Sequence, residues 1–263
     1  MFRGEQTISD GSMVIVYEDH KHLSPLRVQA GQTLNNRFGT FSHNAMIGKQ
    51  YGEQVVSRNG QGYIYLLAPS PELWTSSLSH RTQILYLADI AMVCLQLEVL
   101  PGSVVIEAGT GSGSLSHALA RSVGETGHLY TYEFNAARAE QAAREFESNG
   151  LSPGRVTCQH GDVCQPGWEY VGLAPQSVDA AFFDLPQPWD AVPRAAAYLR
   201  PGGRLATFSP CIEQIARTLQ VLPGLGFTRP EVIEVLVRTH EVREAAQSDA
   251  ISEAVQLAER EGR

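Results

Sequence analysis

Apolar and polar residues follow two different patterns along this chain, and the change between them comes near residue 68. In residues 1–68 the apolar positions fall in short, often β-branched stretches separated by Gly, Asn, Asp and Ser. These stretches are MVIVYED, LRVQA, GTFSHNAMIG, GEQVVS and GYIYLLA. No helical period of any length interrupts them, so residues 1–68 are predicted to form a small, barrel-like all-β domain.

The remainder of the chain shows a regular alternation of strand-like and helix-like stretches. Residues 69–80 read as a proline-bearing linker, and a helical period begins near Arg81. Strands are predicted at 104–109, 128–133, 155–163, 178–186, 204–210 and 231–239, with amphipathic helices between them. This order predicts an α/β, doubly wound domain over residues 81–240, with helices on both faces of a parallel sheet. The charged, Ala-rich residues 241–263 are predicted to form a helix or a frayed end.

A glycine-rich turn links the strand-like VVIEA to the helix-like LSHALA, between Val104 and Ala120. Gly109, Gly111 and Gly113 follow the pattern G-x-G-x-G, and glycines let a ligand approach the backbone closely. This arrangement indicates a nucleotide-type site at the carboxyl end of a parallel strand. A plain tight turn is the alternative. The spacing departs from the dinucleotide fingerprint, since Ser114 stands where that pattern requires glycine.

Carboxylates at the predicted strand ends narrow the choice of ligand. Glu133 ends the second parallel strand, where it can accept two hydrogen bonds from a ribose diol. Glu107 immediately precedes the glycines and would repel a pyrophosphate, so it favours an amino-acid-bearing nucleoside over NAD. Asp162 follows the third strand and can accept a hydrogen bond from an adenine amine, although such a residue also suits a turn.

The string DLPQPW, Asp184 to Trp189, is the most specific local signal. An Asp that ends an apolar strand lies at the ligand crevice, two prolines restrict the backbone after it, and Trp189 offers a face for stacking a base. A proline-rich turn with a capping Asp is the alternative. Two roles are open for Arg81, Thr82 and Gln83, which are expected either to contact a ligand or to cap the first helix. A second strand-end loop is predicted at FSPCIEQ, and its Cys211 is interpreted as a structural residue.

Composition excludes several classes of function. The four cysteines form no CxxC pair, which favours thiols in a reducing compartment over a metal site. No apolar run is long enough to cross a bilayer, and the first residues lack the apolar region of a signal peptide. The net charge of −8 does not attract nucleic acid by itself, so such a substrate requires a local basic patch or a partner.

Seven strings, taken in order, resemble those of a known family. PSPELW, SHRTQILY, EAGTGSGS, the Glu of TYEFNAAR, GDVC, DLPQPW and FSPCIEQ are similar to motifs of S-adenosylmethionine-dependent methyltransferases. They resemble most closely the catalytic subunits of the eukaryotic tRNA (adenine(58)-N1)-methyltransferases. The resemblance covers residues 60–240 and implies a Rossmann-like methyltransferase domain preceded by a small all-β domain.

The resemblance also implies a cofactor, S-adenosylmethionine, and a set of site residues. It identifies Asp184 as the catalytic carboxylate. The implied cofactor-binding residues are Leu85, Glu107, Gly109, Gly111, Ser112, Gly113, Ser114, Glu133, Arg138, Asp162, Val163 and Asp184. The candidate substrate-binding residues are Arg81, Gln83, Pro186, Trp189, Ser209 and Pro210. Further implications are tRNA as substrate, a non-catalytic tRNA-binding partner subunit in a two-plus-two heterotetramer, no membrane, no metal and a nuclear location.

The carboxyl end departs from the family. Family members close with a strand of the form HTGYLTFA, which EVREAAQSDAISEAVQLAEREGR lacks, so we expect a truncated or variant product with an unpaired sheet edge. Three alternative interpretations remain open. The first is a methyltransferase with another target, the second is a non-catalytic scaffold subunit that keeps the fold, and the third is a nicotinamide oxidoreductase. The glycine spacing and Glu107 disfavour the third.

Overall fold

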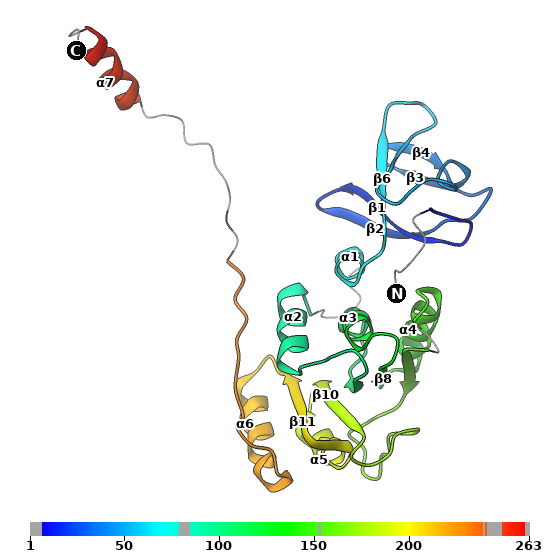
Figure 1. Ribbon diagram of the computed structural model, residues 1–263, viewed down its shortest axis with the longest axis vertical. Helices are drawn as coiled ribbons and strands as arrows, with labels where there is room; N and C mark the ends of the chain where they lie inside the picture. Colours follow the sequence, from blue (N-terminus) through cyan, green and yellow to red (C-terminus); the bar gives the residue numbers. More distant parts are fainter. Residues whose placement is uncertain (1–6, 79–84, 152–153, 239, 241–248, 261–263) are drawn as a thin grey trace. The chain divides into compact units, whose positions relative to one another are not determined.

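The structure is a computed structural model that describes residues 7–78, 85–151, 154–238, 240 and 249–260. Internal contacts divide the chain into two units, residues 1–232 and 233–263. The first unit holds every described sheet, drawn from blue through green to yellow in Figure 1, and the second holds helix α7 (Asp249–Arg260). Within the described part of the chain, no helix combines the length and apolar character needed to span a bilayer.

The first described residues form antiparallel β-structure, which confirms the all-β prediction for this region. A four-stranded sheet has the order β2-β1-β6-β5, and a second sheet pairs β3 with β4. The strands are β1 (Met13–Asp19), β2 (His22–Arg27), β3 (Thr33–Asn36), β4 (Gly39–Ser42), β5 (Gln54–Val56) and β6 (Tyr63–Leu67), with the short 3-10 helix η1 (His43–Ala45) after β4. Alternate residues such as Val14, Val16, Ile64 and Leu66 are buried in one core, as the two-residue period of a strand requires.

Helix α1 (Pro71–Ser77) follows β6 directly, where a proline-bearing linker was predicted. Ser70 caps this helix by accepting a hydrogen bond from the backbone N–H of Leu73, and Pro71 occupies its first turn. Trp74 is buried with Leu78 and packs against Met13 of β1. Helix α2 (Leu87–Gln96) then leads to the parallel sheet.

Five parallel strands with helices on both faces confirm the predicted α/β domain. The sheet order is β11-β10-β7-β8-β9, and every neighbouring pair is parallel. The strands are β7 (Val104–Ala108), β8 (His128–Glu133), β9 (Val156–His160), β10 (Val178–Asp184) and β11 (Leu199–Phe208). The helices are α3 (Ser114–Val123), α4 (Ala136–Ser148), α5 (Pro188–Tyr198) and α6 (Ile212–Val221), followed by the 3-10 helix η2 (Pro223–Leu225).

Successive residues of β7 belong to different cores, because side chains alternate across a strand. Val105 packs in a cluster with apolar residues of α2, α3 and α4, whereas Ile106 packs with residues of α5 and of the α6–η2 segment. The two clusters therefore cover opposite faces of the sheet. Buried on both sides, the central strands are nearly continuous apolar runs, as is typical of parallel sheets.

The strand order places a topological switch point at β7. The chain moves from β7 to β8 and β9 on one side, and then returns to β10 and β11 on the other. Loops that leave adjacent strands in opposite directions open a crevice at the carboxyl ends of those strands. Here the loop after β7 is the glycine-rich turn, and the residue that ends β10 is Asp184.

The predicted strand at 231–239 is wrong over its described residues, 231–238, which have no strand structure. Val232, Ile233, Leu236 and Val237 expose between 45% and 74% of their surface. The apolar pattern reflects strand propensity, but a strand also requires a neighbour to share its backbone hydrogen bonds. This segment pairs with none of the described strands.

Candidate active site at the carboxyl ends of the parallel strands

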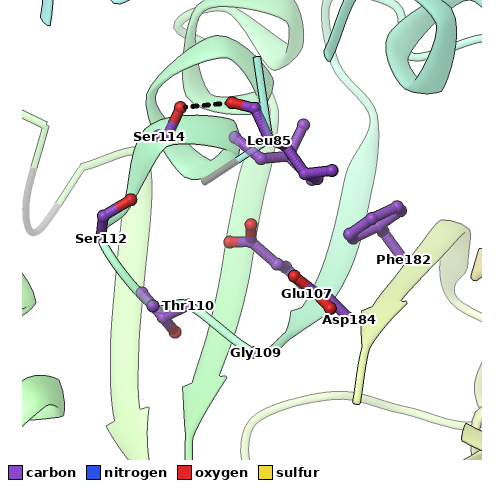
Figure 2. Close-up of a pocket in the computed structure, with 10 residues that line it drawn as sticks. Leu85, Glu107, Gly109, Thr110, Ser112, Ser114, Phe182 and Asp184 are labelled. Atoms are coloured by element: carbon purple, nitrogen blue, oxygen red, sulfur yellow. Dashed lines mark hydrogen bonds between the residues drawn. The ribbon is translucent and has the colours of Figure 1, made fainter. Parts of the chain in front are cut away.

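A pocket opens at the switch point, between the loop after β7 and the end of β10. Most of its lining residues were predicted site residues, and Figure 2 shows how they surround one hollow. The lining consists of Leu85, Glu107, Gly109, Thr110, Gly111, Ser112, Ser114, Leu115, Phe182 and Asp184. The structure thus brings together seven predicted residues from three separate stretches of sequence: Leu85, Glu107, Gly109, Gly111, Ser112, Ser114 and Asp184.

The glycine loop adopts a conformation that requires glycine. Gly109, Gly111 and Gly113 have φ values of 93°, 55° and 73°, in the left-handed region that other residues rarely adopt. A Cβ atom on Gly109 would lie 2.2 Å from the carbonyl oxygen of Asp184, so the loop and the end of β10 touch through backbone atoms. The plain-turn interpretation explains the positive φ values, but it does not account for this contact between two strand ends.

Glu133 orders the glycine loop from the neighbouring strand. Its Oε2 accepts a hydrogen bond from Gly111 N at 3.0 Å, while its Oε1 accepts from Asn135 N at 2.9 Å and from Arg138 Nη2 at 2.6 Å. Burial raises the pKa of Glu133, but the Arg138 and backbone hydrogen bonds outweigh burial and hold this pKa below its ordinary value. Glu133 is therefore a buried carboxylate, and the lone pairs of its Oε2 allow that atom to accept one more hydrogen bond.

Glu107 lines the pocket and is only 1% exposed. Its Oε2 accepts a hydrogen bond from Ser116 Oγ at 2.6 Å. Burial raises the pKa of Glu107 to about 7 against the opposing effect of its hydrogen bonds, and the charges of Asp184 and Glu133 act in the same direction as burial. A ligand that carried positive charge beside Glu107 would stabilise its ionised form.

Asp184 is the half-buried last residue of β10 and pairs in register with Phe208 of β11. Burial raises the pKa of its carboxyl group. Glu107 and Asp184 therefore present two carboxyl groups to the same pocket, and none of the described lining residues is Lys or Arg. Such a lining attracts cations and disfavours a pyrophosphate.

Other predicted residues, including Glu133 and Arg138, lie outside the lining of the pocket. Gly113 faces the ring of Phe146 behind the loop, Val163 is in the core, and Asp162 Oδ1 accepts a hydrogen bond from Cys164 N in a turn. The candidate substrate-binding residues Pro186, Trp189, Ser209 and Pro210 are also absent from the lining, and the Arg217 guanidinium lies 5.2 Å over the Trp189 ring. Arg81 and Gln83 lie outside the described residues.

Some residues at the site were missed by sequence reasoning. Thr110, Leu115 and Phe182 line the pocket, and all three lie within stretches whose strands, loop and helix were predicted from the sequence. Thr110 Oγ1 and Thr131 Oγ1 are 2.6 Å apart in the interior. Behind the loop, the buried His117 ring places Nδ1 2.6 Å from Gly113 O and Nε2 2.9 Å from Asn149 Nδ2. No sequence signal distinguishes this histidine from any other polar residue of an amphipathic helix.

The His117 ring is held in one neutral form. Because a carbonyl only accepts, Nδ1 carries the hydrogen toward Gly113 O, and Nε2 accepts from Asn149. Burial lowers the pKa of His117 to about 4. Elsewhere, no cluster of His, Cys, Asp and Glu suited to a metal ion occurs among the described residues, and the four cysteines are free thiols.

The fold and its switch-point pocket define a Rossmann-like methyltransferase domain. A solved structure described as a SAM-dependent O-methyltransferase from Thermotoga maritima is similar to it, with a TM-score of 0.78 and 30% sequence identity. The match covers 91% of this chain and 87% of that one. More specifically, the chain belongs to the family described as "tRNA methyltransferase complex GCD14 subunit", whose model matches residues 62–262.

Curated relatives of the chain carry a more specific name. The tRNA (adenine(58)-N(1))-methyltransferase catalytic subunit TRM61 of Cryptococcus neoformans is 44% identical over 245 residues, which cover 92% of this chain and 55% of that protein. The subunit of the same name from Schizosaccharomyces pombe is 43% identical over 236 residues, covering 88% of this chain and 64% of its own length. The chain therefore spans between about half and two thirds of the length of these relatives.

Proposed function

We propose that this chain transfers a methyl group from S-adenosylmethionine to N1 of adenine 58 in tRNA, as the catalytic subunit of a heteromeric complex. The observation that carries the proposal is the pocket at the switch point, where the glycine loop, Glu107 and Asp184 converge. The names of the 44% and 43% identical relatives support the same reaction and the same substrate.

The residues of the pocket suit this methyl donor. S-adenosylmethionine carries a positive sulfonium and an ammonium group, which match the two carboxyl groups of Glu107 and Asp184. Behind the glycine loop, Glu133 Oε2 has a remaining acceptor position that suits a ribose hydroxyl, and the positive-φ glycines bring the backbone close to the hollow. A nicotinamide dinucleotide would bring its pyrophosphate to a lining without a described Lys or Arg, which disfavours an oxidoreductase.

The chemistry assigns a limited role to the protein. S-adenosylmethionine supplies an electrophilic methyl group, and adenine N1 carries a free lone pair, so no residue has to remove a proton before the attack. The chain must hold the base in line with the donor, which is a problem of orientation. We expect Asp184, which lines the pocket, to accept a hydrogen bond from the adenine amine and to stabilise the positive charge that develops on the ring.

The substrate imposes two further requirements. N1 lies on the pairing edge of adenine, so the base must leave its stack before reaction. A chain with a net charge of −8 provides little attraction for tRNA phosphates. We therefore propose that a basic, non-catalytic partner subunit supplies much of the tRNA surface, in a heterotetramer of two plus two. Tight, salt-sensitive tRNA binding by the isolated chain would contradict the proposal that the partner subunit supplies this surface.

The experiment combines binding with transfer. Calorimetric titration of the full chain with S-adenosylmethionine should give a saturable signal, whereas NAD should give none. The chain, together with its partner subunit, should then methylate a tRNA that has adenine at position 58 and leave a tRNA with guanine at that position unmodified. Binding of NAD, or equal methylation of both tRNAs, would refute the proposal.

A further inference from the structure

A buried chain of hydroxyl groups connects helix α1 to the pocket. Thr75 Oγ1 lies 2.8 Å from Ser114 Oγ, and Ser114 Oγ donates a hydrogen bond to Leu85 O at 3.2 Å, shown as the dashed line in Figure 2. Thr75, Ser114 and Leu85 expose 9%, 4% and 9% of their surfaces. Ser114 and Leu85 line the pocket, but Thr75 does not, because it lies one layer behind.

The direction of these hydrogen bonds follows from the chemistry of a hydroxyl group. Ser114 has a single hydroxyl hydrogen, which it donates to the Leu85 carbonyl, so toward Thr75 it can only accept. Thr75 must therefore be the donor in the first bond. The chain runs from Thr75 to Ser114 to Leu85, and the removal of its first member leaves a buried acceptor without a donor.

Helix α1 is also attached to the glycine loop at adjacent positions. The ring of Trp74 lies 4.9 Å from the ring of His117, whose Nδ1 donates to Gly113 O. Glu72, one turn earlier, pairs with Arg121 of α3 at 2.6 Å. These contacts hold α1 against α3 and so restrict the position of the Thr75 hydroxyl relative to the loop.

We propose that Thr75 is a positioning residue for the methyl donor. It holds Ser114, and through Ser114 the backbone of Leu85, in the arrangement that the donor requires where these two residues line the pocket. The inference rests on the proposed function, because it takes S-adenosylmethionine to be the ligand of this pocket. It adds a residue that contributes to donor affinity without contacting the donor.

The test compares three variants of the full chain. Thr75→Val keeps the side-chain shape and removes the donor, so it should raise the dissociation constant of S-adenosylmethionine by about five- to tenfold, as expected for one buried hydrogen bond. Thr75→Ser restores a hydroxyl group and should bind almost as the wild type does. Ser77→Ala is the matched control, because Ser77 is buried to a similar extent in the same helix and donates instead to Trp74 O.

A double-mutant cycle separates positioning from a general loss of structure. In the Ser114→Ala background the chain is already broken, so Thr75→Val should add little to the loss of donor affinity. Wild-type affinity in Thr75→Val, an equal loss in Ser77→Ala, or full additivity with Ser114→Ala would each overturn the inference. A wild-type chain that binds no S-adenosylmethionine would refute the proposed function, and the inference would fall with it.

Discussion

Glu107 and Asp184 face one pocket from adjacent parallel strands, and the charge of Asp184 adds to the effect of burial in raising the pKa of Glu107 to about 7. Two carboxyl groups in one hollow oppose each other's ionisation. A cationic ligand would relieve this repulsion, because it stabilises both ionised forms. The pocket is therefore suited to take up positive charge near neutral pH.

The first prediction concerns stability and Glu107. The pKa of Glu107 is about 7 in the folded chain and 4.5 in its ordinary state. The folded protein thus holds this proton more tightly than the unfolded chain, and wild-type stability should fall as the pH rises through this window. Glu107→Gln stays neutral, so its free energy of unfolding should increase relative to that of the wild type between about pH 5 and about pH 8. Urea unfolding across the range measures this difference.

The control for that experiment is Glu147→Gln, at an exposed position of α4. Its free energy of unfolding should follow that of the wild type at every pH. If the difference between Glu107→Gln and the wild type were constant over the range, the pKa of Glu107 would be the same in the folded and unfolded chains, and the predicted rise of this pKa on folding would be wrong.

His117 should have the opposite dependence on pH. Burial lowers its pKa from 6.5 to about 4. Between these two values, the histidine is protonated in the unfolded chain but neutral in the folded chain. Stability contributed by this neutral histidine is present above its ordinary pKa and is lost as the pH falls toward its folded pKa. His117→Gln should show a weaker acid dependence of the melting temperature. An unchanged acid slope would contradict the prediction.

Gly109→Ala should damage the site more than a positive φ alone explains. Gly109 has a φ of +93°, and a Cβ there would lie 2.2 Å from Asp184 O. Gly102 has a φ of +96°, but its nearest neighbour is Thr126 Oγ1 at 3.5 Å. In both alanine variants, the left-handed backbone conformation should lower the free energy of unfolding by about 1–2 kcal/mol. Only Gly109→Ala should also displace the end of β10, lower the melting temperature further and abolish methyl transfer. Equal effects would refute the backbone contact.

Asp184→Asn should abolish methyl transfer while donor binding remains measurable. The amide keeps the shape of the side chain but removes the negative charge that would stabilise the methylated base. Transfer to tRNA in the presence of the partner subunit and calorimetric titration with S-adenosylmethionine measure the two properties separately. Asp190→Asn, an exposed neighbour in the first turn of α5, is the control and should remain active. Full activity in Asp184→Asn would exclude Asp184 from the reaction.

Much of the fold could be predicted because its information is local. The alternation of apolar runs and amphipathic helices predicted all five parallel strands, since both faces of each strand are covered. The segment 231–238 shows the limit of this reasoning. Its apolar pattern is that of a strand, but backbone pairing depends on a neighbour that no pattern within the segment can supply.

The sequence by itself determined that glycines follow one strand and that Asp184 ends another, because strand propensity and turn chemistry are properties of short stretches. Only the tertiary structure decided that these two strand ends are neighbours, since the order β11-β10-β7-β8-β9 arises from packing between distant segments. For the same reason, sequence reasoning did not predict the hydrogen bond between Thr75 and Ser114, which are 39 residues apart in sequence. Contacts between elements that are distant in sequence depend on tertiary packing, so neither stretch alone contains a signal for them.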